Sequence, residues 1–95
     1  MHVISRKKLV EFWRRHPKAE QPLKAWFNRA KKAKWMKFGD VLGDYNSADQ
    51  VGRFVVFNVG GNKYRLITVI HYNRQKVYIR HVLTHQEYDQ DDWKN

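Results

Sequence analysis

Residues 84–89 read T-H-Q-E-Y-D and bring a histidine, a tyrosine and two carboxylates together within six positions. Histidine titrates near neutral pH and can move a proton in either direction, and tyrosine can stack on a base or hold a phosphate. We expect this segment to follow directly on a strand, where functional side chains often gather. Two interpretations are open. Either His85 and Tyr88 belong to a catalytic site, or the segment is a terminal cap in which His85 packs and Glu87 pairs with a lysine.

Three arginines, Arg53, Arg65 and Arg80, fall in three consecutive runs of strand-like composition. A guanidinium group is planar, stays charged and matches two phosphate oxygens at once, so an arginine on a strand can hold a phosphate. On neighbouring strands the three would form a basic patch across a sheet, with Lys63 near its exposed end. The alternative is that they are simply solvated on an open face.

The three runs span residues 53–59, 63–72 and 76–83, and turn-forming residues at 60–62 and 73–75 separate them. The Gly-Gly-Asn at 60–62 suits a hairpin turn because glycine accepts positive φ angles. Three consecutive strands with short connections predict an antiparallel meander.

Strict alternation assigns the side chains of these strands to the two faces of the sheet. It places Arg65 on the same face as Ile67, and on the third strand it places Ile79 and His81 together, opposite Arg80.

Helical patterns precede the strands. After a short extended start at residues 2–4, Ser5 can cap a helix over residues 6–16, which a proline then stops. A second helix is predicted from about residue 20 to position 39 at the latest. Residues 40–52 have no clean period and are rich in glycine and aspartate, so we expect a surface loop there.

Together these elements predict an α+β fold in which two N-terminal helices pack on one face of a small, curved, mainly antiparallel sheet. We expect one domain over residues 1–95, because 95 residues suffice for a single core and no linker is visible. The acidic tail at 84–95 is either a short helix or a frayed end.

The charge is strongly and unevenly positive. Nineteen Lys and Arg against nine Asp and Glu give +10, and residues 1–38 alone hold twelve bases and two acids. Such a surplus favours a polyanionic partner, of which nucleic acid is the commonest, over a merely solvated surface. Two interpretations are also open for the second helix, where a basic face is formed by Lys31, Lys32 and Lys34. This face either contacts RNA or the ribosome, or it is simply solvated.

Other classes of protein find less support. The chain has no cysteine, and its histidines lack the spacing of metal ligands, so we predict no metal and no cofactor. No apolar run approaches the roughly 18–20 residues of a membrane span, and the start lacks the apolar core of a signal peptide. We therefore expect a cytoplasmic protein without a membrane partner.

The block V-V-F-N-V-G-G-N-K-Y-R-L at 55–66, followed by V-Y-I-R-H-V-L-T-H-Q-E-Y-D at 77–89, closely resembles the HigB toxin family. With the helical first half, the resemblance covers nearly the whole chain. Family members are similar in fold to the RelE and ParE toxins. RelE toxins cut mRNA on the ribosome and are silenced by a cognate antitoxin.

The resemblance implies roles for particular residues. It puts Arg65 at the strand arginine that RelE-like nucleases aim at the scissile phosphate, and His85 and Tyr88 in the segment that supplies the remaining catalytic groups. Arg53 stands where RelE carries the first of two strand lysines. Val55 stands at the second, so that lysine pair is missing here and the general base stays open.

The implied reaction is attack by a ribose 2′-hydroxyl on the adjacent phosphorus, in which the RNA supplies its own nucleophile and no metal is required. Arg65 would neutralise charge with help from Arg53 or Arg80, His85 would transfer a proton, and Tyr88 would position a base. The implied partners are mRNA, on the ribosome, and a helix-turn-helix antitoxin like HigA. The rival functions are an inhibitor of the same fold that does not cleave, and an RNA-binding accessory protein without toxicity.

Overall fold

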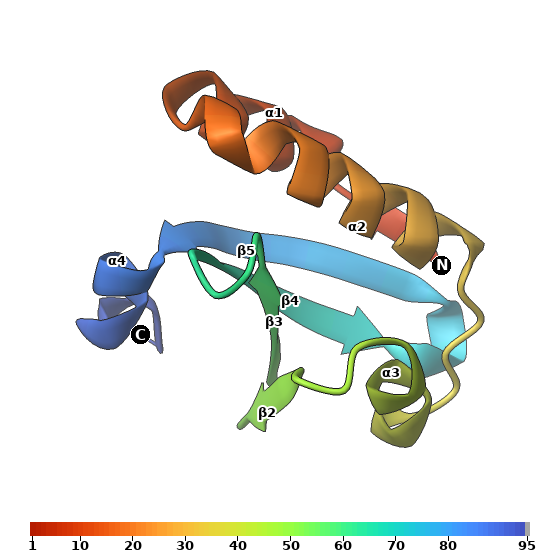
Figure 1. Ribbon diagram of the computed structural model, residues 1–95. Coiled ribbons are helices and arrows are strands. Elements are labelled where there is room, and N and C mark those ends of the chain that lie inside the picture. Colours follow the sequence, from red (N-terminus) through yellow and green to blue (C-terminus); the bar gives the residue numbers. More distant parts are fainter. Residues whose placement is uncertain (95) are drawn as a thin grey trace.

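The computed structural model describes residues 1–94, as nine helices and strands together with single turns of 3-10 helix (Figure 1). In chain order the elements are β1 (His2–Ile4), α1 (Arg6–Arg15), α2 (Glu20–Lys32), α3 (Phe38–Asp44), β2 (Asp49–Val51), β3 (Phe54–Val59), β4 (Tyr64–His71), β5 (Lys76–Thr84) and α4 (His85–Asp89). The 3-10 turns span Pro17–Ala19, Tyr72–Arg74 and Asp92–Lys94.

The five strands form one open sheet in the order β1-β5-β4-β3-β2. Strand β1 runs parallel to β5, and the other neighbours are antiparallel. Helices α1 and α2 lie side by side over one face of this sheet, whereas α4 and the described C-terminal end lie at the far end of β5 from the N-terminus (Figure 1). The predicted α+β fold with a mainly antiparallel sheet is therefore confirmed.

The main core fills the space between these two helices and the sheet. Leu9 and Phe12 of α1 and Leu23 of α2 are almost fully buried there, as are Phe57 and Leu66 from the strands beneath them. Large aromatic side chains bury much area per ordered side chain, which helps a chain of this size to form a core.

Both N-terminal helices begin where the sequence predicts. The Ser5 hydroxyl accepts a hydrogen bond from the Lys7 N–H at 3.2 Å, and α1 ends just before Pro17. Helix α2 begins at residue 20 but ends at residue 32, seven residues before the latest end expected for it. The terminal amine of Met1, just before β1, binds the carbonyls of Lys31 and Ala33 at 3.2 and 2.6 Å, so this amine takes up acceptors that a longer helix would need.

The loop expected over residues 40–52 is wrong in two places, because this stretch contains most of α3 and all of β2. Helix α3 turns Val41, which is fully buried, toward the core, and Phe38 and Tyr45 pack beside it. These three lie at helical spacing, but the two glycines within the helix mask the pattern.

Alternation predicts the faces of β4 correctly and those of β5 incorrectly. On β4, Leu66 faces the helices and Ile67 the opposite side. On β5, His81 pairs with Ile67 and Ile79 with the next residue of β4, which leaves Arg80 without a partner in the ladder. This bulge shifts the alternation by one residue, so Ile79 packs under the helices while Leu83 reaches the other face.

Candidate active site

A second, smaller core lies on the face of the sheet away from α1 and α2. It is built by Phe54 and Val56 of β3, Ile67 of β4 and Trp93 from the C-terminal segment, with Tyr88 packed against them. Arg65 is the next residue on this face of β4, so it stands at the edge of this small core. The C-terminal segment therefore covers the sheet beside Arg65.

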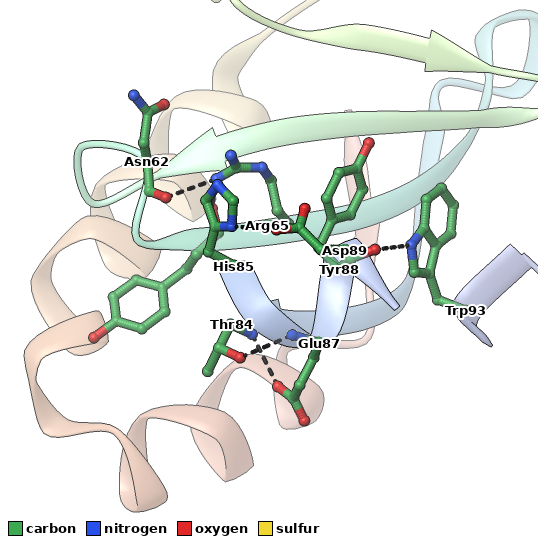
Figure 2. Close-up of polar contacts among 9 residues, drawn as sticks. Asn62, Arg65, Thr84, His85, Glu87, Tyr88, Asp89 and Trp93 are labelled. Carbon is green, nitrogen blue, oxygen red and sulfur yellow. Dashed lines mark hydrogen bonds and ion pairs between the residues drawn. The ribbon is translucent and has the colours of Figure 1, made fainter. Parts of the chain in front are cut away.

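A capping box starts helix α4 directly at the end of β5. The Thr84 hydroxyl accepts from the Glu87 N–H at 3.2 Å, and a Glu87 carboxylate oxygen accepts from the Thr84 N–H at 2.9 Å (Figure 2). Such reciprocal bonds satisfy backbone donors that a helix start leaves free. Glu87 therefore caps the helix, and the lysine partner considered for it is not its partner here.

One side of α4 carries three of the polar groups, because His85, Tyr88 and Asp89 follow at spacings of three and four residues. The backbone N–H of His85 donates to the Lys63 carbonyl at 3.1 Å, which connects the start of α4 to the residue just before β4. Nδ1 of His85 lies 2.9 Å from Oδ2 of Asp89. This contact is an ion pair when the imidazole is protonated, and Nε2 is the ring nitrogen that lies away from Asp89.

Arg65 is held by backbone and by a ring. Its Nη1 donates to the carbonyls of Asn62 at 2.9 Å and Tyr64 at 3.2 Å, and its Cζ lies 5.4 Å from the centroid of the Tyr88 ring (Figure 2). Within residues 1–94 no carboxylate lies within ion-pair distance of this guanidinium. Its Nε and Nη2 edge is thus left for an anion from outside.

The turn that supplies the Asn62 carbonyl depends on glycine. Gly60, Gly61 and Asn62 all have positive φ, between 60° and 74°. A Cβ on Gly60 would come within 3.0 Å of the Tyr64 ring, so no larger residue fits there without a shift. The hairpin turn predicted at 60–62 is confirmed, and it also orients Arg65.

The carboxylates around this site are largely engaged. Glu87 caps α4, Asp89 binds His85, and Asp91 lies 3.3 Å from the Lys94 ammonium. Each pairing reduces the repulsion that an acidic segment would exert on a phosphate at Arg65. The acidic tail is therefore compatible with an arginine that is available to bind an anion.

The structure brings Arg65, His85, Tyr88 and Lys63 together but separates the other predicted basic residues from them. Arg53 precedes β3, whereas Arg65 pairs with Asn58 near the other end of that strand. Five residues of strand span about 16 Å, so the predicted patch of three arginines across the sheet does not form. The Arg53 guanidinium lies over the Phe54 ring at 5.1 Å instead.

Arg80 and the α2 lysines also lie elsewhere. Arg80 sits at the β5 bulge, where it lines a hollow of about 210 Å³ with Lys8 and Arg15 of α1. At the end of α2, the Lys31 carbonyl binds the N-terminal amine beside the start of β5, while α4 follows the end of that strand. Nine residues of β5 put roughly 26 Å between these two ends. Lys31, Lys32 and Lys34 are therefore a separate basic surface.

Sequence reasoning missed two residues at the site. Trp93 is only 5% exposed, and a lone tryptophan in an otherwise polar tail is the signal that could have predicted an anchor there. His81 lines a hollow of about 310 Å³ beneath α4 with Leu83, Glu87 and Trp93. Burial, followed by the nearby charges of Lys8 and Arg80, lowers the pKa of His81 below its ordinary value of 6.5. The β5 bulge put His81 on this face, which alternation alone could not show.

Two features are absent from the part of the chain that the structure describes. Within residues 1–94 no three histidine, aspartate or glutamate side chains are grouped so that they could hold a metal ion. None of the helices in this part of the chain is long and apolar enough to span a membrane.

The fold and this cluster define a small RelE-like α+β protein with an arginine, a histidine and a tyrosine gathered at one end of the sheet. The sequence profile of the HigB toxin family, described as the RelE-like toxic component of a toxin–antitoxin system, matches residues 19–91. The chain belongs to the HigB toxin family.

Curated relatives agree with this assignment. The chain is 35% identical over 92 residues to the mRNA interferase toxin HigB of Escherichia coli (strain K12), a match that covers 94% of this chain and 88% of the relative. The mRNA interferase HigB of Shigella flexneri matches to the same extent. The mRNA interferase HigB of Escherichia coli O6:H1 is 25% identical over 92 residues, which cover 94% of this chain and 89% of that protein.

Proposed function

We propose that this protein is the toxin of a type II toxin–antitoxin pair and that it cleaves mRNA as a metal-independent endoribonuclease. The observation that carries the proposal is Arg65, a guanidinium fixed by the 60–62 turn and by Tyr88, without a carboxylate partner in the described chain, beside His85. Membership of the HigB family and relatives named mRNA interferases support it.

The arrangement suits attack of a ribose 2′-hydroxyl on the adjacent phosphorus. Arg65 would bind the scissile phosphate and neutralise the charge that grows on it in the transition state. His85 would exchange a proton through Nε2, the ring nitrogen away from Asp89. Tyr88 would position the RNA next to the cut through its hydroxyl edge, because Arg65 and Trp93 lie against its ring.

Val55 stands where RelE carries its second strand lysine, so its position decides whether this strand can supply a general base. It is 2% exposed and packs in the core under the helices, so it offers no group to the opposite face where Arg65 lies. His85 is therefore our candidate for proton transfer, and whether it acts as acid or base is left to experiment.

The remaining basic residues would contact RNA away from the cut. Lys63 adjoins the site, whereas Arg53, Arg80 and the α2 surface of Lys31, Lys32 and Lys34 lie farther off. Contacts at such positions strengthen binding through phosphate charge and do not specify sequence. We propose that they hold mRNA on the ribosome, in the cytoplasm, and that a helix-turn-helix antitoxin like HigA neutralises the protein.

The test separates a nuclease from an inhibitor of the same fold. Purified protein is added to a defined mRNA, alone and in a translating extract, and the RNA ends are mapped. We expect new 5′ ends at discrete positions with wild-type protein. Protection of the RNA without any new end would contradict the proposal and favour an inhibitor that only binds.

A further inference from the structure

Arg65 begins a series of ring contacts that crosses the face of the sheet away from α1 and α2. The guanidinium lies over Tyr88, and the Tyr88 ring stacks on Trp93 with centroids 5.2 Å apart and planes 15° from parallel. Trp93 then meets Phe54 edge to face, with centroids 5.6 Å apart at 76°. Figure 2 shows Trp93 beyond Tyr88, away from Arg65.

Trp93 is anchored more firmly than the residue it stacks on. It is buried against Phe54, Val56 and Ile67, and its indole Nε1 donates to the Tyr88 carbonyl at 3.0 Å. Tyr88 is half-buried and belongs to α4, whose five residues are too few for a helix that is stable by itself. The place of the Tyr88 ring therefore depends on what packs against it.

We propose that Trp93 is a positioning residue of the proposed active site: by stacking on Tyr88 and binding its carbonyl, it keeps the Tyr88 ring against Arg65 and so keeps the guanidinium oriented. Trp93 need not touch RNA. The inference rests on the proposed function and assigns to it a residue two positions beyond the region that the family profile matches.

Loss of Trp93 would act on the rate of cleavage more than on binding. Without the indole, Tyr88 and Arg65 would adopt several orientations, and the one that suits the transition state would have to be selected at each turnover. Phosphate charge would still attract the RNA from Lys63 and the distant lysines. We therefore expect a fall in kcat with little change in KM.

The experiment measures kcat and KM of the full chain for Trp93→Leu, Trp93→Phe, Tyr88→Ala and the double variant Trp93→Leu/Tyr88→Ala. Trp26→Leu is the matched control, because Trp26 is 3% exposed and also meets a phenylalanine edge to face, but under the helices. Rates are normalised to the folded fraction. Arg65→Ala is measured in parallel as a test of the site itself.

We expect Trp93→Leu to lower kcat at least about tenfold with KM within about threefold, Trp93→Phe to restore most of the rate, and Trp26→Leu to keep kcat. In the Tyr88→Ala background the Trp93 substitution should cost less than about twofold, because it acts through Tyr88. If Trp93→Leu does not fold, Trp93→Met, which has a flexible apolar side chain but no ring to stack on Tyr88, takes its place in the cycle.

Three outcomes would overturn the inference. One is a wild-type kcat in Trp93→Leu, or in Trp93→Met where the leucine variant is unfolded, while Arg65→Ala is inactive; the proposed function would then stand. Another is a loss of kcat on Trp93→Leu that is as large in the Tyr88→Ala background as in the wild-type protein. The third is cleavage unaffected by Arg65→Ala, which would overturn the proposed site as well.

Discussion

At the scale of single residues, the basic side chains differ in what holds them. Arg29 lies 3.3 Å from the Asp44 carboxylate, and Lys31 is exposed at the end of α2. Arg65 is bound by two backbone carbonyls and a tyrosine ring, with no carboxylate partner in the described chain. A charge fixed in this way can act on a transition state, because little reorganisation is needed when the phosphate charge grows.

Arg65→Ala and Lys31→Ala should therefore have different effects. Loss of a positioned donor costs about 3–4 kcal/mol of barrier, so Arg65→Ala should lower the cleavage rate roughly a hundredfold to a thousandfold. Lys31→Ala should weaken RNA binding modestly and reduce the salt dependence by about one unit of slope. Rates and affinities measured across a salt series check both. Near wild-type cleavage by folded Arg65→Ala would remove it from the site.

His85→Ala should slow cleavage and change its pH dependence, because the group removed is one that transfers protons. The pH–rate profile should lose one limb. His71→Ala is the control, since His71 is also exposed but lies at the other end of β4 from Arg65. A lower rate with an unchanged profile would mean that His85 positions RNA and does not move a proton.

At the scale of elements, α4 depends on its cap because it has only five residues. Thr84→Ala removes the acceptor of the capping box, which costs about 1 kcal/mol, and should fray the segment that carries His85 and Tyr88. Ser5→Ala removes the matching cap of α1 and should lower the free energy of unfolding by a similar amount. Denaturant unfolding and cleavage assays of both variants should show lost activity only for Thr84→Ala. If Thr84→Ala and Ser5→Ala had equal activity per folded molecule, α4 would not position the site.

The sequence predicts the elements whose pattern is local. Strict alternation along β4 places Arg65 correctly, and the Ser5 cap and the 60–62 turn lie where expected. Helix α3 is hidden because glycines interrupt its apolar positions, and the β5 bulge follows from long-range pairing that no local period encodes. The cluster at residues 84–89 is recognisable from composition, whereas its partner Trp93 becomes visible only once the tail folds back on the sheet.

At the scale of the molecule, the positive charge and the candidate site are on different parts of the surface. The end of α2 lies near the start of β5, whereas α4 lies at the other end of that strand (Figure 1). Arg65 pairs with Leu83 near the C-terminal end of β5. An arrangement of this kind can attract RNA over a wide area while chemistry occurs at one place. A partner that covers the candidate site would block the proposed cleavage, whereas one that covers the α2 surface would weaken the proposed RNA binding.

Expression of the protein alone should arrest bacterial growth. Co-expression of a small helix-turn-helix protein encoded by a neighbouring gene should restore growth. The reason is that an acidic partner surface can mask the +10 charge that would attract RNA in the proposed function. Growth curves after induction, with Arg65→Ala as the inactive control, check this. Harmless induction of verified wild-type protein would count heavily against a toxin.

The chemical nature of the cut ends tests the central claim most directly. The RNA is cleaved by the purified protein in excess EDTA or, in assays with ribosomes, by protein that was treated with EDTA and washed before the ribosomes were added. The termini of the products are then analysed. A substrate with a 2′-deoxyribose at the cut position is tested in parallel. Attack by the 2′-hydroxyl predicts undiminished cleavage in EDTA, a 2′,3′-cyclic or 3′-phosphate with a 5′-hydroxyl, and no cut in the deoxy substrate. Products with 5′-phosphate ends, or cleavage of the deoxy substrate, would mean that an activated water attacks, and would contradict the mechanism assigned to Arg65 and His85.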